Sequence, residues 1–327
     1  MKRREFIRLL GGATIAWPVT AMAQQLRRIG ALMSLYAPTD REGAASAKAF
    51  ADTLQKLGWT DGNNLRIDYR WPSGDPALIK ASAAELVNSR PDLIVAAANP
   101  AVAELHRLTD TIPLVFTRVV DPIGSGFVAG LARPGGNITG FQAADSGLGS
   151  KWIEVLRELD PAIGRIAVLY GSDSEGNMAL LHAAEAGAKA TAVPLIPIDI
   201  HIDTALDAAL ASFSRQPGGG LIVIPHPWTT SNRKTIIALA ERYRLPAVYA
   251  YRFFAADGGL MSYGPDQLEQ WRGAASYADR ILRGEKPSDL PVQTPTTYEL
   301  VINLKTANAI GLRVPPEFSI LADEVIE

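Results

Sequence analysis

Short apolar runs alternate with longer amphipathic stretches along most of this 327-residue chain. Residues 92–97 and 220–224 are almost continuously apolar, which is typical of parallel strands buried on both faces. Apolar residues at helical spacing separate these runs. The other runs of strand length are residues 28–33, 65–69, 112–117, 165–170, 192–198 and 247–249. This alternation predicts an α/β fold of parallel sheets wound by right-handed crossovers.

The repeats fall into two series, which predicts two doubly wound parallel-sheet lobes. The first series ends near a short edge strand at residues 137–140, and the second begins with a helix near residues 149–159. We therefore expect a three-segment hinge between a first lobe of residues 24–143 plus 262–295 and a second lobe of residues 144–261 plus 296–327. Paired glycines accept backbone angles that other residues resist, so we place a hinge at Gly258 and Gly259. An ordinary loop before an edge strand is the alternative there.

The first 23 residues have the pattern of an export signal. A basic start that includes Arg3 and Arg4 precedes an apolar run at residues 9–19, and Ala21-Met22-Ala23 matches a cleavage site. The apolar run is about half of the roughly 20 residues that a transmembrane helix needs. Arg3 and Arg4 also resemble the twin-arginine signal, with the general secretory route as the alternative.

Composition narrows the possible functions. The chain is 47% apolar and 20% charged, as in an ordinary soluble globular protein. Its net charge of −2 provides no basic field for nucleic acid. Without cysteine there are no disulfides, thiol nucleophiles or thiolate metal sites, and four scattered histidines do not predict a metal cluster. The glycines at residues 124, 126 and 130 miss the dinucleotide-binding spacing. We expect no cofactor, no metal and no catalytic residue.

Polar and aromatic residues gather where the predicted strands end. Ligands of open α/β sheets lie beyond the carboxyl ends of the strands, so these residues predict a small-molecule cleft. The candidate ligand-binding residues are Ser34, Tyr36, Asn99, Thr117, Asp121, Tyr170, Ser172, His226 and Tyr251. Helix starts after Asn99 and Ser172 would offer backbone N–H groups to a carboxylate. The alternative is that such residues merely cap their own helices, with Asn99 as an N-cap before a first-turn proline.

Four segments carry a resemblance to a known family. They read VDP at residues 120–122, RPGGNITG at 133–140, GGLMSYG at 258–264 and LVINLKTA at 300–307. Together they resemble the ABC-transporter substrate-binding family associated with tryptophan or tyrosine uptake, over about residues 27–327. The resemblance implies a type I periplasmic-binding-protein fold, with two lobes, three crossings and a ligand between the lobes. Residues 225–228, PHPW, depart from the family because they bring no carboxylate for an α-ammonium group. Asp121 could serve that group or cap its own turn.

The sequence thus predicts a periplasmic solute-binding protein, monomeric and independent of nucleic acid, that delivers its ligand to an ABC permease by hinge closure. We expect an aromatic or apolar carboxylic acid or amino acid, with the acid binding at least as well as the amino acid. A sensory ligand-binding protein for a membrane receptor is the first alternative. A periplasmic α/β enzyme is the second, although no nucleophile–base pair is visible in the sequence.

Signal cleavage generates the first testable prediction. We expect the exported protein to begin at Gln24, because Ala21-Met22-Ala23 is the small-residue pattern that signal peptidases cut after. Mass spectrometry of protein recovered from the periplasm checks this. An intact N-terminus in that fraction contradicts the prediction. Replacing Arg3 and Arg4 with lysine slows export only if the twin-arginine route is used.

Overall fold

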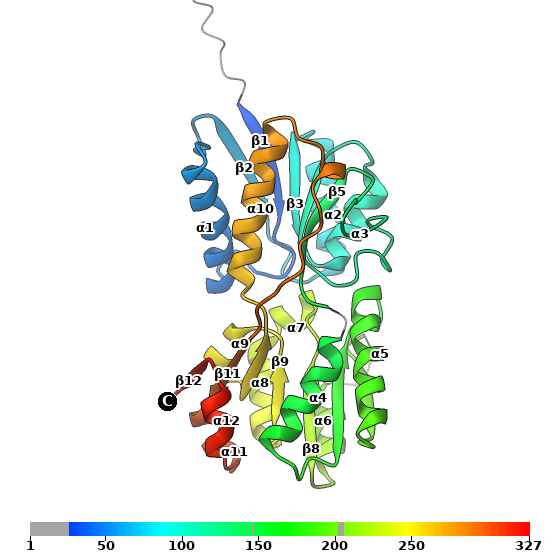
Figure 1. Ribbon diagram of the computed structural model, residues 1–327, viewed down its shortest axis with the longest axis vertical. Coiled ribbons are helices and arrows are strands. Elements are labelled where there is room, and N and C mark those ends of the chain that lie inside the picture. Colours follow the sequence, from blue (N-terminus) through cyan, green and yellow to red (C-terminus); the bar gives the residue numbers. More distant parts are fainter. Residues whose placement is uncertain (1–25, 146, 202–205) are drawn as a thin grey trace, which may run out of the picture.

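The computed structural model describes residues 26–145, 147–201 and 206–327. The predicted export signal, residues 1–23, lies outside the described residues. Two lobes follow one another along the long axis of the molecule, and the chain passes between them three times (Figure 1). No helix in the described part of the chain is long and apolar enough to cross a membrane.

The first lobe has a five-stranded parallel sheet in the order β2-β1-β3-β4-β5. Its strands are β1 (Arg27–Leu32), β2 (Leu65–Arg70), β3 (Leu93–Ala97), β4 (Leu114–Val119) and β5 (Ile138–Gln142). Its helices are α1 (Arg41–Lys56), α2 (Pro76–Asn88), α3 (Asn99–Leu108) and α10 (Gln267–Leu282), with the 3-10 turn η1 (Pro287–Asp289). The helices α1 and α10 pack on one face of the sheet and α2 and α3 on the other. This sandwich explains why β3 and β4 are buried along their whole length.

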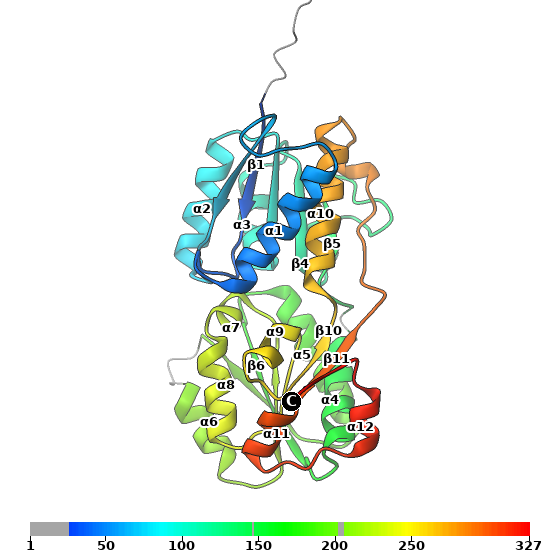
Figure 2. The same cartoon turned by 90° about the vertical axis from the view of Figure 1, so that its left-hand side faces the viewer.

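The second lobe has a seven-stranded sheet in the order β12-β11-β10-β9-β8-β6-β7. Its strands are β6 (Arg165–Tyr170), β7 (Leu195–Asp199), β8 (Gly219–Val223), β9 (Ala247–Tyr249), β10 (Met261–Gly264), β11 (Glu299–Asn303) and β12 (Glu324–Ile326). Its helices are α4 (Leu148–Leu159), α5 (Glu175–Ala190), α6 (Leu206–Ser214), α7 (Pro227–Ser231), α8 (Arg233–Arg242), α9 (Arg252–Ala256), α11 (Leu304–Ile310) and α12 (Pro316–Leu321). The sheet is mostly parallel, with β10 antiparallel to β11. Figure 2 shows α4 and α8 on opposite sides of it. The predicted fold class, two wound α/β lobes, is confirmed.

The second crossing lies later than the sequence suggested. The strand β10 belongs to the second sheet, so the chain leaves that lobe after Gly264 and not at residue 262. Gly258 and Gly259 are inside the second lobe, where their N–H groups donate to Ala255 and Phe254 and close the turn after α9. The assignment of the hinge to these two glycines is therefore wrong. The crossing itself is Gly264-Pro265-Asp266, and Asp266 then caps α10 by accepting from the N–H of Leu268.

Gly264 gives a prediction about this crossing. A Cβ at residue 264 would lie 1.8 Å from the Ala250 carbonyl oxygen, so any side chain forces β10 away from its neighbour. We expect Gly264→Ala to lower the free energy of unfolding by about 1–3 kcal/mol, the usual cost of overpacking. Gly136→Ala is the control, because a Cβ there meets nothing within 4 Å. Urea denaturation of the two variants checks the prediction, and equal stabilities would contradict it.

Candidate functional site

The carboxyl ends of β1 to β5 in the first lobe and of β6 to β10 in the second face each other across the lobe boundary (Figures 1 and 2). The lobes touch directly there. Ser231 Oγ of the second lobe donates to the Leu35 carbonyl oxygen of the first over 3.1 Å. A Cβ on Gly176 would lie 2.7 Å from the Val120 oxygen, so α5 begins against the end of β4. The predicted strand-end residues thus lie at or near an interface between lobes.

Arg233 forms an ion pair that ties the lobes together. Its Nη1 lies 2.6 Å from Asp40 Oδ2 in the first lobe, and its Nε lies 2.7 Å from Asp257 Oδ2 in its own lobe. The side chains of Arg233 and Asp40 are only 7% and 13% exposed. Burial alone would lower the pKa of Arg233, but the two carboxylates outweigh burial and raise it. Asp40 also caps α1 by accepting from the N–H of Glu42, which fixes the carboxylate at the interface.

Arg118 is a second buried arginine at the interface, and its partners are neutral. It lies inside β4, where the register of the strand shifts between Thr117 and Val119, with a φ of 58°, and it is 3% exposed. Its Nη1 donates to Tyr36 Oη and, over 3.0 Å, to Gln267 Oε1, while its backbone N–H donates to Gln270 Oε1 over 2.9 Å. Its guanidinium carbon lies 3.8 Å from the ring centre of Tyr251 in the second lobe, within cation–π range. Residues of both lobes therefore enclose this cation.

Tyr36 supplies a neutral oxygen to this cluster. Burial raises the pKa of Tyr36 against the opposing field of Arg118, so the phenol keeps its proton at neutral pH. That proton is donated to Gln267 Oε1 over 2.7 Å. Within the described part of the chain, Arg118 Nε and Nη2 have no hydrogen-bond partner.

Asp173 lies between two histidines near the end of β6. His226 Nε2 is 3.1 Å and His201 Nε2 is 3.0 Å from Asp173 Oδ1, although the contact with His226 is outside hydrogen-bond geometry. Burial raises the pKa of Asp173, but the imidazoles of His226 and His201 outweigh it and hold the pKa well below its ordinary value. The sequence predicted no cluster of histidines, because residues 173, 201 and 226 are far apart in the chain and come together only in the folded lobe.

The tautomer of His226 argues against a metal site in this cluster. His226 caps α7: its Nδ1 accepts the Trp228 N–H over 3.1 Å, and its own N–H donates to Thr229 Oγ1 over 2.9 Å. A ring nitrogen that accepts a hydrogen bond carries the lone pair, so Nε2 of the neutral ring carries the proton. Nε2 of the neutral ring then has no lone pair for a metal ion.

Most of the remaining predicted residues support the backbone. Asn99 is not the N-cap of α3, because Ala98 holds that position and Asn99 instead bonds the backbone of Val120 through Nδ2 (2.7 Å) and Oδ1 (3.0 Å). Asp121 accepts the Gly124 N–H over 2.9 Å and so caps its own turn. Ser34 Oγ donates to the Ala97 oxygen.

The predicted residues of the second lobe include two that are more open to solvent. The N-cap of α5 is Ser174, so the helix start expected after Ser172 lies two residues later. Ser172 is exposed and Tyr170 half-buried. Thr117, in β4 of the first lobe, is fully buried. Of the predicted set, Tyr36 and Tyr251 meet through Arg118.

The residue that joins them, Arg118, was missed. Its signal in the sequence is a single arginine inside the apolar segment 112–120. Its partners Gln267 and Gln270 come about 150 positions later in the chain, so no local pattern connects them.

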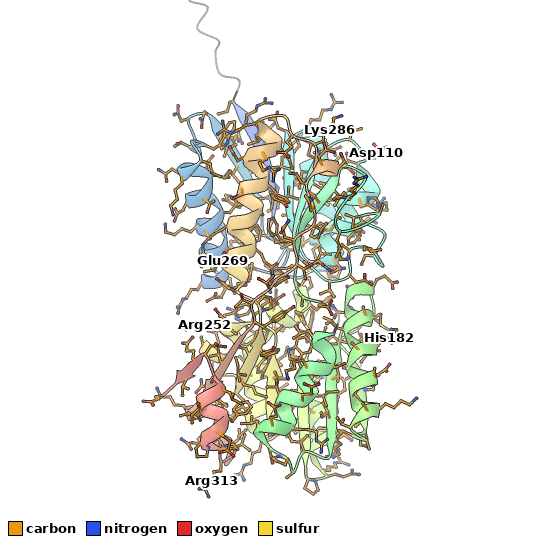
Figure 3. All side chains as sticks on the ribbon, in the orientation of Figure 1. Asp110, His182, Arg252, Glu269, Lys286 and Arg313 are labelled. Atoms are coloured by element: carbon orange, nitrogen blue, oxygen red, sulfur yellow. The ribbon has the colours of Figure 1, made fainter. Side chains whose placement is uncertain are left out.

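A separate groove of about 840 Å³ lies between α1, α10 and residues 293–297 of the third crossing, and Glu269, labelled in Figure 3, lines it. Gln270 is the one residue that it shares with the Arg118 cluster, and none of the predicted ligand-binding residues lines it. Its rim carries the exposed Arg272–Glu269 ion pair. We therefore place the candidate site at the lobe interface and not in this groove.

Comparison with known proteins supplies the family. The model of the family described as ABC transporter substrate binding protein matches residues 40–326. A tyrosine-binding protein of Clostridioides difficile (strain R20291) is 25% identical over 272 residues, which cover 81% of this chain and 76% of that protein. A conserved domain protein of Vibrio cholerae matches in structure with a TM-score of 0.83, 25% identity, and coverage of 92% of this chain and 100% of that one. An ABC domain from Streptococcus pneumonia in complex with L-Trp matches with a TM-score of 0.82, 24% identity, and coverage of 92% and 99%.

The depressed pKa of Asp173 gives a prediction. A carboxyl whose pKa is lower in the folded than in the unfolded state stabilises the fold above its unfolded pKa, about 3.9, and loses that stabilisation as the pH falls below it. We expect Asp173→Asn to be less stable than wild type at pH 7, with the difference shrinking below about pH 4. Urea denaturation at a series of pH values measures this.

Asp207→Asn is the matched control, because both contacts of the Asp207 carboxylate, with Arg242 Nη1 at 3.5 Å and with Tyr243 Oη at 2.5 Å, are exposed to solvent. Its effect on stability should be small at every pH. A stability difference for Asp173→Asn that does not change with pH would contradict the assigned role.

Proposed function

This chain belongs to the family of ABC transporter substrate binding proteins, and on that premise we propose that it holds a small organic ligand between its lobes and delivers it to an ABC permease. The family is one of binding proteins, which supports a role without catalysis. The export signal expected in residues 1–23 would place the mature protein in the periplasm, on the side of the membrane from which an importer takes up its ligand.

The observation that carries this proposal is the buried polar interface between the lobes. Arg118 of the first lobe lies against Tyr251 of the second, and Arg233 of the second pairs with Asp40 of the first. Only the three crossings join the lobes covalently, so rotation about them separates these groups while each sheet stays intact. A ligand that contacts both lobes favours the closed arrangement, which is the differential contact that hinge closure requires.

The relatives support an aromatic amino acid as the ligand. One relative is named for tyrosine, and the Streptococcus structure holds L-Trp. In this chain the ring centres of Tyr36 and Tyr251 lie 5.7 Å and 3.8 Å from the guanidinium carbon of Arg118 at the interface. Flat aromatic faces suit an aromatic or apolar ligand body. A sensory protein that reports the same ligand to a membrane receptor is the second candidate, because it would use the same closure.

Closure is tested by removing the ion pair between the lobes. We expect Asp40→Asn to weaken ligand binding about fivefold or more, ~1 kcal/mol, because the asparagine still caps α1 but no longer pairs with Arg233. Asp257→Asn is the matched control: it removes a carboxylate from the same arginine within one lobe, so it lowers stability and leaves closure intact. Isothermal calorimetry with L-tryptophan, L-tyrosine and 3-phenylpropionate on ligand-stripped protein measures affinity.

X-ray scattering on the same samples measures closure. The radius of gyration should fall on ligand binding in wild type and in Asp257→Asn. Binding without any change in the radius of gyration would contradict closure, and failure of all three compounds to bind would contradict the proposed ligand class. Equal losses of affinity in the two variants would overturn the role of the Arg233–Asp40 pair.

A further inference from the structure

The two buried arginines of the interface differ in their counter-ions. Arg233 is 6% exposed and has two carboxylates within 2.7 Å. Arg118 is 3% exposed, and among the described residues no carboxylate forms a hydrogen bond or ion pair with it. Proteins rarely bury an arginine without an anion, because the desolvated charge needs compensation. Arg118 therefore lacks the partner that Arg233 has.

The unpaired atoms of Arg118 lie on one edge of the guanidinium group. Nη1 is occupied by Tyr36 and Gln267, while Nε and Nη2 are buried without a partner in the described structure. The N–H of Nε and one N–H of Nη2 point in parallel from the same side of the planar group. That spacing matches the two oxygens of a carboxylate, and a single carbonyl or hydroxyl oxygen satisfies only half of it.

The acidic residues of the region are directed elsewhere. Glu42 accepts from Gln267 Nε2 over 3.2 Å, and Gln267 is on the Nη1 side of Arg118, away from the free edge. Asp121 accepts the N–H of Gly124, and Asp173 Oδ1 lies 3.1 Å from His226 Nε2 and 3.0 Å from His201 Nε2. An α-ammonium group beside a carboxylate on the free edge would therefore be buried near the guanidinium group without a protein carboxylate paired to it.

We propose that Arg118 anchors the carboxylate of the ligand through Nε and Nη2, and that the ligand is an aromatic or apolar monocarboxylic acid without an α-ammonium group. This inference rests on the proposed function and narrows its ligand class. Tyr251 of the second lobe covers the guanidinium. If the lobes close without a ligand, Nε and Nη2 of Arg118 are buried without hydrogen-bond partners. If they close on a carboxylate, both nitrogens donate hydrogen bonds to it. Arg118 links the charge of the ligand to closure.

Three matched compounds test the ligand class: 3-phenylpropionate, its neutral amide 3-phenylpropanamide, and L-phenylalanine. In calorimetry on ligand-stripped wild type we expect the acid to bind about tenfold or more tightly than the amide or the amino acid, because the latter two leave a buried group unpaired. Arg118→Gln should bring the acid and the amide within about threefold of each other. Arg118→Lys should keep part of the preference for the acid over the amide, because lysine retains the positive charge but lacks the two parallel N–H donors of the guanidinium group.

Arg233→Gln is the control, because it weakens closure for every ligand and leaves the ratio of acid to amide unchanged. If Arg118→Gln still binds the acid about tenfold more tightly than the amide, the proposed role of Arg118 as carboxylate anchor is overturned. Tighter binding of L-phenylalanine than of the acid overturns the ligand class, and so does failure of the acid to bind wild type. If L-tryptophan or L-tyrosine then binds with closure in scattering, the proposed function stands and this inference alone fails.

A measurement without ligand separates an anchor from a structural arginine. Arg118→Met removes the unpaired charge, so we expect the melting temperature of the empty protein to stay the same or to rise. A clear fall in the melting temperature, with wild-type circular dichroism at low temperature, indicates that Arg118 serves packing and overturns the proposal.

Discussion

Burial of parallel strands on both faces constrains where this protein can place polar chemistry. In each lobe helices cover both sides of the sheet, so the middle strands carry apolar residues along most of their length. Polar side chains then gather where the strands end and the helices begin. Because all strands of a parallel sheet end at the same edge, these side chains share one edge of each lobe. The two edges face each other, and the lobe interface is the consequence.

The periodicity of the sequence was sufficient for the fold class but not for the hinge. Alternation of apolar runs and amphipathic segments predicted two wound lobes, because this local pattern follows directly from burial in a parallel sheet. The pair Gly258 and Gly259 looked more flexible than Gly264-Pro265-Asp266, yet the glycines close a turn after α9. The pattern of β10 is apolar whichever sheet it joins. Only its pairing with β11 and β9 assigns it to the second lobe.

Only the part of the candidate site that follows from local position in the chain was predicted. Strand ends identify Tyr36 and Tyr251, because position in the βα unit is enough to locate them. The capping role of Asn99 was wrong, since its amide bonds the backbone of Val120, a contact 21 positions away. The importance of Arg118 depends on Gln267 and Gln270, which lie in α10 after the second crossing, and on Tyr251 of the second lobe. No local pattern in the sequence reports such a contact.

The two arginines have opposite effects on an empty closed state. Arg233 gains Asp40 whenever the lobes meet, so it favours closure whether or not a ligand is present. Arg118 becomes enclosed beneath Tyr251 at the same time, and closure without an anion leaves Nε and Nη2 unpaired. A binding protein needs this balance, because a ligand shifts an equilibrium only by its differential affinity for the two states. Arg233 alone would favour closure with or without a ligand, and Arg118 makes the closed state depend on the chemistry of what is bound.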